Sequence, residues 1–310
     1  MLDNKLGVFR YLLTRNDIVW QRLSNEEKQL IFKANRDSNN THYANPEEYG
    51  NRRIEGGQVF DSPVDRLSLT QGKILQEVLL AYNPSTILEI GPGSGFYTRL
   101  ICDYETVRKY RAVDIVRPFL DYLDPRLQNM VQARQLDSYQ LIHGDFMHIE
   151  LESADLIVLL SAVHHIPNRV QLFQKLSASL TDKGCIVCLE PTHYLSRMFH
   201  LTYRYLKRYH KREFWSDYRN LGTHAFCTYE EFANIVQMIP GLEIAEVYFD
   251  ISRKADWLRG LVAQFDPGSF WQHNKYVYQK PGWLRWFAFQ MGVVLENSEY
   301  IHPDRTRPSE

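Results

Sequence analysis

The sequence has few cysteines, almost no excess of either charge and no long apolar run. A formal net charge of −1 over 310 residues provides no general attraction to nucleic acid, so we expect no nucleic-acid partner. No apolar run approaches the roughly 20 residues that a helix needs to span a bilayer. Residues 1–7 lack the layout of a signal peptide. We therefore expect a cytoplasmic globular protein.

Only four cysteines are present, and two of them, Cys185 and Cys188, have the spacing of a C-x-x-C motif. Both lie within an apolar pattern typical of a strand, where residues three apart point to opposite faces. Such a pair cannot easily bind one metal ion together. We expect buried reduced thiols and no metal site.

The chain does contain a regular alternation of strand and helix patterns from residue 86 onward. Alternation of this kind predicts an α/β fold, with a Rossmann-like, doubly wound and mostly parallel sheet. Residues 154–160 are apolar except for Asp155, as a buried parallel strand should largely be. The expected strands are 86–90, 110–115, 139–144, 154–160 and 185–189, and the expected helices are 96–104, 117–123 and 169–180.

The segments on either side predict further elements. Residues 4–35 and 66–82 have helical apolar spacing, whereas the polar residues 36–57 are expected to form a loop or lid. An aromatic and basic insertion follows the fifth strand, and a glycine turn, 182–184, precedes that strand. A helix over 228–239, with Thr228 as its N-cap, and a strand over 242–249 come next. We expect a helical cap over 1–65, a central domain over 66–250 with an insertion at 192–226, and an aromatic-rich extension over 251–310.

Residues 87–98, ILEIGPGSGFYT, are the most informative stretch. They are typical of a strand, a glycine-rich turn and the start of a helix, which is the layout of a nucleotide-binding loop. Phe96 stands where a dinucleotide fingerprint has its third glycine, which disfavours a nicotinamide cofactor. Glu89 suits a ligand with a cationic end, such as S-adenosylmethionine (SAM). Backbone can approach a ligand closely at the three glycines of the turn, Gly91, Gly93 and Gly95.

Other polar residues follow the next three strands. Asp114 closes the second strand and can accept hydrogen bonds from both hydroxyls of a ribose. Asp145 and Phe146 follow the third strand. The fourth strand ends in the run SAVHHIP at residues 161–167. Since ligands bind outside the carboxyl ends of strands in such sheets, these residues are expected to meet in one site.

Together these motifs resemble the class I SAM-dependent methyltransferases, in the small-molecule branch often labelled type 11 or type 12. The resemblance covers residues 70–190 closely and 228–249 loosely. It implies SAM as the cofactor, S-adenosylhomocysteine (SAH) as its product, and a small-molecule acceptor methylated on O, N or C. The cofactor-binding residues that it implies are Glu89, Gly91, Gly93, Gly95, Asp114, Ile115, Asp145, Phe146 and Ser161.

Methyl transfer needs a base only when the acceptor must lose a proton. Either His164 or His165 could take that proton, since histidine titrates near neutral pH, and His165 is our first choice. An amine or a stabilised carbanion would need no strong base. The catalytic role of the two histidines is thus conditional on the acceptor.

Substrate recognition is expected from the cap and from the insertion. Tyr43 and Tyr49 could close over SAM or the acceptor, and His193 could line the pocket from the end of the fifth strand. Residues 194–212 carry six basic and no acidic side chains, which is compatible with a packing helix, an anionic substrate or a lipid surface. The apolar run 283–295 could pack on the main domain, touch a membrane or join a homodimer interface.

Two alternative functions remain open on these residues. One is a methyltransferase that acts on a lipid- or glycan-linked acceptor at the membrane surface. The other is a SAM-binding protein without transferase activity, a scaffold or regulator, because the loop and the acids bind cofactor without performing the transfer.

Overall fold

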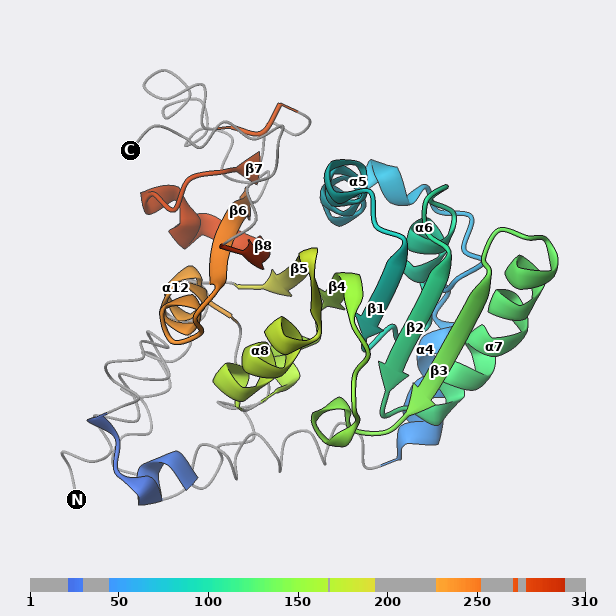
Figure 1. The fold of residues 1–310 in the computed structure, drawn as a ribbon, viewed down its shortest axis with the longest axis horizontal. Coiled ribbons are helices and arrows are strands. Elements are labelled where there is room, and N and C mark those ends of the chain that lie inside the picture. The colour runs from blue at the N-terminus through green and yellow to red at the C-terminus, as the bar shows by residue number, and fades with distance from the viewer. Residues whose placement is uncertain are drawn as a thin grey trace.

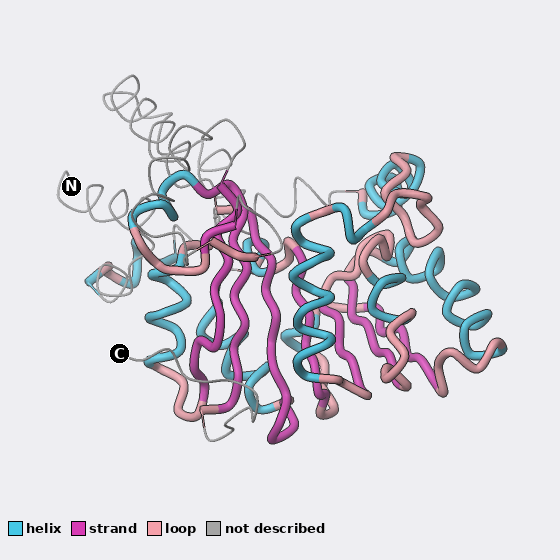
Figure 2. Tube along the Cα trace, turned by 90° about the horizontal axis from the view of Figure 1, so that it is seen from above, coloured by secondary structure: helices cyan, strands magenta, loops and turns pink. Residues whose placement is uncertain are grey.

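The computed structural model describes residues 22–29, 45–166, 168–192, 227–251, 270–272 and 277–298. Its centre is one eight-stranded sheet with the order β3-β2-β1-β4-β5-β8-β6-β7, whose strands lie side by side across the molecule (Figures 1 and 2). The strands are β1 (Thr86–Ile90), β2 (Lys109–Asp114), β3 (Ser138–His143), β4 (Ala154–Leu160), β5 (Leu180–Pro191), β6 (Leu242–Ile251), β7 (Val277–Tyr278) and β8 (Ala288–Asn297).

The first five strands are parallel, and the last three are antiparallel to their neighbours. The predicted α/β fold with a Rossmann-like, mostly parallel sheet is therefore confirmed. Strand order reverses between β1 and β4, so the carboxyl ends of these two strands form the topological switch point at which open sheets bind ligands.

Helices cover both faces of the sheet. Alternate residues of β1 face opposite ways: Leu88 joins a core with α8 and α12, and Ile87 joins a core with α5, α6 and α7. Cys188 and Cys185 are likewise buried in these two different cores, as the strand period predicts. The α-helices are α4 (Pro46–Glu55), α5 (Thr70–Tyr82), α6 (Thr98–Cys102), α7 (Arg117–Gln132), α8 (Arg169–Ala178) and α12 (Tyr229–Gln237).

The C-terminal apolar run contributes to the sheet itself. Residues 288–297 form β8, which lies between β5 and β6 and buries Val293 and Leu295. This part of the run thus packs in the main domain, one of the three alternatives that the sequence left open. The expected turn over 182–184 is wrong, because these residues lie inside β5, where the register with β4 shifts between Ala154 and Leu156.

The expected loop over 36–57 is also wrong for residues 46–55, which form α4. Asn45 caps this helix by accepting a hydrogen bond from the backbone N–H of Glu48, and Pro46 occupies its first turn. The glycine at position 50 allows close packing, since a Cβ there would lie 2.8 Å from the Cβ of Pro118 in α7. The sequence analysis predicted a loop here because residues 36–57 are mostly polar, and it overlooked the helix-start signals Asn45 and Pro46. In Figure 1, α4 lies behind β2 and β3 near their carboxyl ends, next to α7.

Candidate functional site

A cavity of about 950 Å³ opens at the switch point of the sheet. Its walls come from the segments that follow β1, β2, β3 and β4, together with α4. A volume of this size is within the range of pockets that hold small molecules and cofactors. Eight of the nine predicted cofactor residues line it: Glu89, Gly91, Gly93, Asp114, Ile115, Asp145, Phe146 and Ser161.

The ninth, Gly95, lies behind the cavity wall. Its φ of +74° favours glycine, and a Cβ at this position would lie 2.3 Å from the Cδ2 atom of Leu123. Gly93 also has a positive φ, +55°, but a Cβ there would meet nothing within 4 Å. Two glycines of the loop therefore have different roles. Gly93 faces the cavity, and Gly95 allows the loop to pack against α7.

Glu89 lies at the base of the cavity. It is buried, and its Oε2 accepts hydrogen bonds from the Tyr110 hydroxyl (2.6 Å) and the Thr98 hydroxyl (2.8 Å). Burial raises the pKa of Glu89 to about 7, although the two hydrogen bonds act in the opposite direction. A cationic group in the cavity would offset this burial by pairing with the carboxylate.

Asp114 is held by the backbone on both oxygens. Gly93 donates its N–H to Oδ2 (3.2 Å), and Val116 donates its N–H to Oδ1 (2.8 Å). Burial raises the pKa of Asp114 to about 6 against these bonds. The glycine loop and the end of β2 thereby hold the carboxylate in place, with lone pairs left for hydroxyl donors.

The segment after β3 is held by a lysine that the sequence analysis did not identify. Lys175 of α8 donates to the carbonyl oxygens of Phe146 (2.7 Å), Met147 (3.1 Å) and Ile149. Asp145 caps the short 3-10 helix Phe146–His148 by accepting the N–H of Met147 at 2.9 Å. This side chain thus both caps the turn and lines the cavity.

The turn after β4 carries Ser161 and both histidines. Ser161 has a φ of +55°, which is uncommon for a residue with a side chain, and the strain lies at the cavity wall. The next residues form a 3-10 helix, Val163–His165. His164 and His165 both line the cavity, and the centroids of their rings are 4.0 Å apart.

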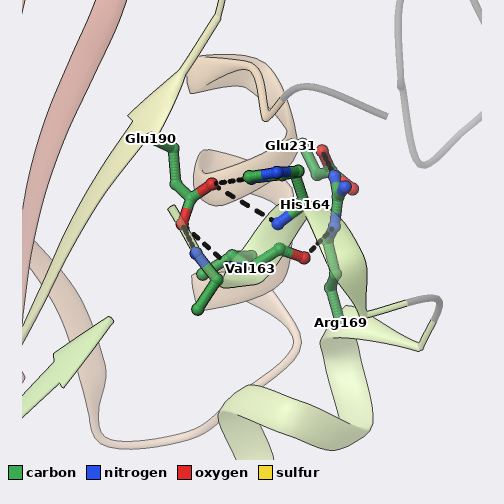
Figure 3. Close-up of polar contacts among 6 residues, drawn as sticks. Val163, His164, Arg169, Glu190 and Glu231 are labelled. Carbon is green, nitrogen blue, oxygen red and sulfur yellow. Dashed lines mark hydrogen bonds and ion pairs between the residues drawn. The ribbon is translucent and has the colours of Figure 1, made fainter. Parts of the chain in front are cut away.

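A buried carboxylate at the end of β5 holds this turn (Figure 3). Glu190 Oε1 accepts the backbone N–H groups of Ala162 and Val163, both at 2.8 Å. Its Oε2 lies 2.7 Å from Nδ1 of His164. Sequence reasoning missed Glu190, although an acid at the end of an apolar strand was a usable signal because buried carboxylates need partners.

The opposite side of the turn is held by an arginine (Figure 3). Arg169 donates to the carbonyl oxygen of Val163 at 3.3 Å and forms a buried ion pair with Glu231 of α12. Both the N–H and the C=O of Val163 are thus bonded to buried charged side chains. The backbone that carries the histidines is fixed from two directions.

The N-terminal wall is attached to the glycine loop by another arginine. Arg66 donates to the carbonyl oxygens of Phe60 (2.6 Å), Val59 (3.2 Å) and Phe96, and its guanidinium lies over the Phe96 ring. Burial lowers the pKa of Arg66 from its usual value. Neither this clamp nor the cavity-lining Arg52 and Arg53 of α4 was identified from the sequence.

The predicted substrate residues divide between described and undescribed parts of the chain. Tyr49 of α4 lines the cavity and packs edge-on against Phe119, with centroids 6.0 Å apart. Tyr43, His193 and the basic segment 194–212 lie outside the described residues. No described helix has both the length and the apolarity to cross a membrane.

Known proteins resemble this chain in sequence over its central part. Residues 88–188 match the model of a family described as a methyltransferase domain. A polyamine aminopropyltransferase from Bacillus cytotoxicus is 25% identical over 148 residues, 46% of this chain and 54% of that protein. The chain thus spans about half the length of the curated relatives it matches.

Solved structures resemble it in fold. The plantazolicin methyltransferase BpumL, crystallised with a triazolic desmethylPZN analog and SAH, has a TM-score of 0.51 at 12% identity, covering 88% of this chain and 100% of that one. The plantazolicin methyltransferase BamL, crystallised with the same analog and SAH, has a TM-score of 0.50 at 13% identity, covering 87% and 98%. At these identities the likeness concerns the fold.

Proposed function

We propose that this chain, which carries a class I methyltransferase domain over residues 88–188, is a SAM-dependent methyltransferase that acts on a small-molecule acceptor. The observation that carries the proposal is the convergence of the ends of four strands on one cavity, with Glu89 and Asp114 at its wall. The SAH-bound relatives of similar fold support SAM as the donor and SAH as the product.

The cavity's residues fit SAM in chemistry. The buried carboxylate of Glu89 suits the amino group, and Asp114, fixed by Gly93 and Val116, suits the ribose hydroxyls. Phe146 would pack on the adenine ring beside Ile115, and Asp145 would accept from the adenine amine. Gly91, Gly93 and Ser161 would let the backbone approach the ligand, with Gly95 supporting the loop from behind.

SAM supplies an activated methyl group on a cationic sulfur, so positioning provides much of the acceleration. Tyr49, with Tyr43 and His193, would contact the acceptor, and His164 or His165 would accept its proton where one must be lost. We also propose that the chain is organised as a helical cap over residues 1–65, a central SAM-binding domain over 66–250 and an extension over 251–310.

The acceptor site favours methyl transfer to a neutral or anionic molecule. Arg52 and Arg53 of α4 line the cavity and would attract an anionic group of the acceptor, whereas the carboxylates of the same cavity are assigned to SAM. The competing reaction is transfer of an aminopropyl group, which the names of the curated relatives give for those proteins. Mass spectrometry of the product distinguishes methyl transfer from aminopropyl transfer, because the two groups add different masses to the acceptor.

The remaining proposals concern location and partners. All four cysteines are buried and none forms a disulfide, which supports a reducing, cytoplasmic compartment. Two contacts stay open as finer alternatives: a homodimer, and a peripheral membrane contact with a lipid- or glycan-linked acceptor. Liposome co-sedimentation that is lost when the charges of residues 197–212 are reversed would favour the membrane version.

Calorimetric titration tests the cofactor assignment. SAM and SAH are expected to bind in the micromolar range, whereas NAD is not. Asp114→Ala is expected to weaken SAH binding at least about tenfold, since buried charge-assisted hydrogen bonds contribute about 1.5–3 kcal/mol. Asp121→Ala, an exposed residue of α7 paired with Arg117, is the control.

Folded wild-type protein that binds neither adenosyl compound would contradict the proposal. Binding without SAH release from any acceptor pool would support instead the scaffold or regulator alternative. Each result leads to a different next experiment.

A further inference from the structure

The carboxylate of Glu190 does more than hold a turn. It is fully buried and does not line the cavity, yet it contacts a side chain that does. Oε1 is occupied by two backbone N–H groups, those of Ala162 and Val163, and Oε2 lies 2.7 Å from Nδ1 of His164. The ring of His164 is itself only 8% exposed. One carboxylate therefore connects the backbone of the turn to an imidazole of the cavity.

This contact selects one form of the imidazole. A carboxylate only accepts hydrogen bonds, so the ring must donate its Nδ1–H to Oε2. In the neutral ring the proton is then on Nδ1, and the lone pair is on Nε2. A carboxylate on Nδ1 also stabilises the imidazolium that forms when Nε2 takes a proton.

We infer that Glu190 is a positioning residue that makes His164 the general base of the site. The inference rests on the proposed methyltransferase function and adds the identity of the base to it. It also specifies the acceptor class: a hydroxyl or another group that carries its proton at neutral pH and must lose it on methylation.

The proton and electron movements balance as follows. A lone pair of the acceptor atom forms the bond to the methyl carbon, and the electron pair of the broken sulfur–carbon bond stays on sulfur. The acceptor's proton passes to Nε2 of His164, and the resulting imidazolium is paired with Glu190. Proton release to solvent then restores the neutral ring.

In a purely structural role, an amide at position 190 would still hold the turn through the bonds from Ala162 and Val163 and would lose only the longer one, from the backbone N–H of His164 to Oε2 (3.4 Å). In Glu190→Gln, the amide oxygen is expected to keep the two bonds from Ala162 and Val163, because only an acceptor fits two N–H donors. Its NH₂ group then faces Nδ1 of His164 and donates to it. The ring must switch to the Nε2–H form, so the lone pair no longer lies on Nε2.

Nitrogen-15 NMR of the full chain with labelled histidine reads this switch. Long-range proton–nitrogen spectra of the neutral ring are expected to show His164 as the Nδ1–H form in the wild type and as the Nε2–H form in Glu190→Gln. His164→Gln assigns the signal. Glu231→Gln is the matched control, because it removes the partner of Arg169 on the other side of the turn and leaves Glu190 in place.

Wild-type protein with the Nε2–H form at His164 would overturn the inference, and so would an unchanged form in Glu190→Gln. The wild-type spectrum decides the question by itself if the variant does not fold. Because these spectra need no acceptor, they remain readable even if SAH does not bind, which would instead contradict the proposed function.

Activity provides a second measurement. With the compound from a panel of phenols, carboxylic acids and amines that releases SAH fastest, Glu190→Gln is expected to lower kcat at least about 100-fold. The KM for SAM should change less than about threefold, because Glu190 does not touch the cavity. The double variant with His164→Gln should lose no more than His164→Gln alone, since the two residues act as one unit. Equal kcat in Glu190→Gln and wild type would also overturn the inference.

Discussion

The ammonium of Lys175 lies 2.7 Å from the carbonyl oxygen of Phe146, and this bond joins α8 to the segment after β3. Two further carbonyl oxygens, of Met147 and Ile149, accept from the same Nζ. One side chain thereby fixes the backbone that presents Asp145 and Phe146 to the cavity.

Lys175→Met is therefore expected to weaken SAH binding about 3–10-fold and to destabilise the fold by about 1–3 kcal/mol, because buried carbonyl groups lose a charged donor. Titration calorimetry and thermal unfolding measure the two effects. Lys109→Met is the control and should leave SAH affinity unchanged, because Lys109 is exposed and lies at the end of β2 away from Asp114 and the cavity. Equal affinities for both variants would show that Lys175 does not shape the site.

The glycine loop predicts a contrast between Gly95→Ala and Gly93→Ala. Both positions have a positive φ, which costs a side chain about 1 kcal/mol. Only at Gly95 does a Cβ also collide with Leu123, so this variant is expected to lose about 2–4 kcal/mol of stability through overpacking. Gly93→Ala should unfold close to the wild type and lose SAH affinity instead.

Thermal unfolding and calorimetry of both variants check this contrast. If Gly95→Ala were as stable as Gly93→Ala, the close packing of the loop against α7 would be wrong.

Arg66 predicts a difference between two arginines that lie close in space. Arg66→Lys cannot reach the carbonyl oxygens of Val59, Phe60 and Phe96 together, because an ammonium lacks the planar fork of donors. We expect lower thermal stability and an SAH affinity reduced about 3–10-fold as the wall of the cavity loosens.

Arg99→Lys is the control, since Arg99 forms an ordinary partly exposed pair with Asp103, for which a loss below about 1 kcal/mol is expected. Protease digestion of the two variants should show earlier cleavage near residues 56–62 in Arg66→Lys alone.

Glu89 predicts opposite effects on stability and on binding. Its pKa in the folded protein is about 7, above the ordinary value of 4.5, so the folded state binds more protons between these pH values. The wild type therefore loses stability relative to Glu89→Gln as pH rises from about 4.5 through 7. From pH 4.5 to above pH 7 the stability difference should shift by about 3 kcal/mol in favour of the variant, whose amide oxygen can still accept from Tyr110 and Thr98.

Denaturant unfolding at a series of pH values checks this sign. SAH binding, measured in parallel, should fall in Glu89→Gln because the amino group of the ligand loses its carboxylate. A stability difference independent of pH would contradict the shifted pKa.

Local sequence patterns predicted much of the fold. Mostly apolar runs placed β1 and β4 at their observed bounds, since parallel strands covered on both faces are rich in apolar residues. Thr228 was correctly expected to cap α12, because capping depends on neighbouring residues alone. The same local logic predicted eight residues that share one cavity, because the carboxyl ends of parallel strands meet at one edge.

The rest depends on contacts between residues distant in the sequence. The place of β8 between β5 and β6 is determined by pairing with strands that are distant in the sequence, which no local pattern specifies. The sequence pattern predicted that Gly95 binds the ligand, whereas in the structure Gly95 packs against Leu123 of α7. The sequence by itself determined which strand ends carry polar groups. Only the tertiary structure brought Glu190 to His164 across 26 residues, because a buried carboxylate takes whatever donors the packed chain provides.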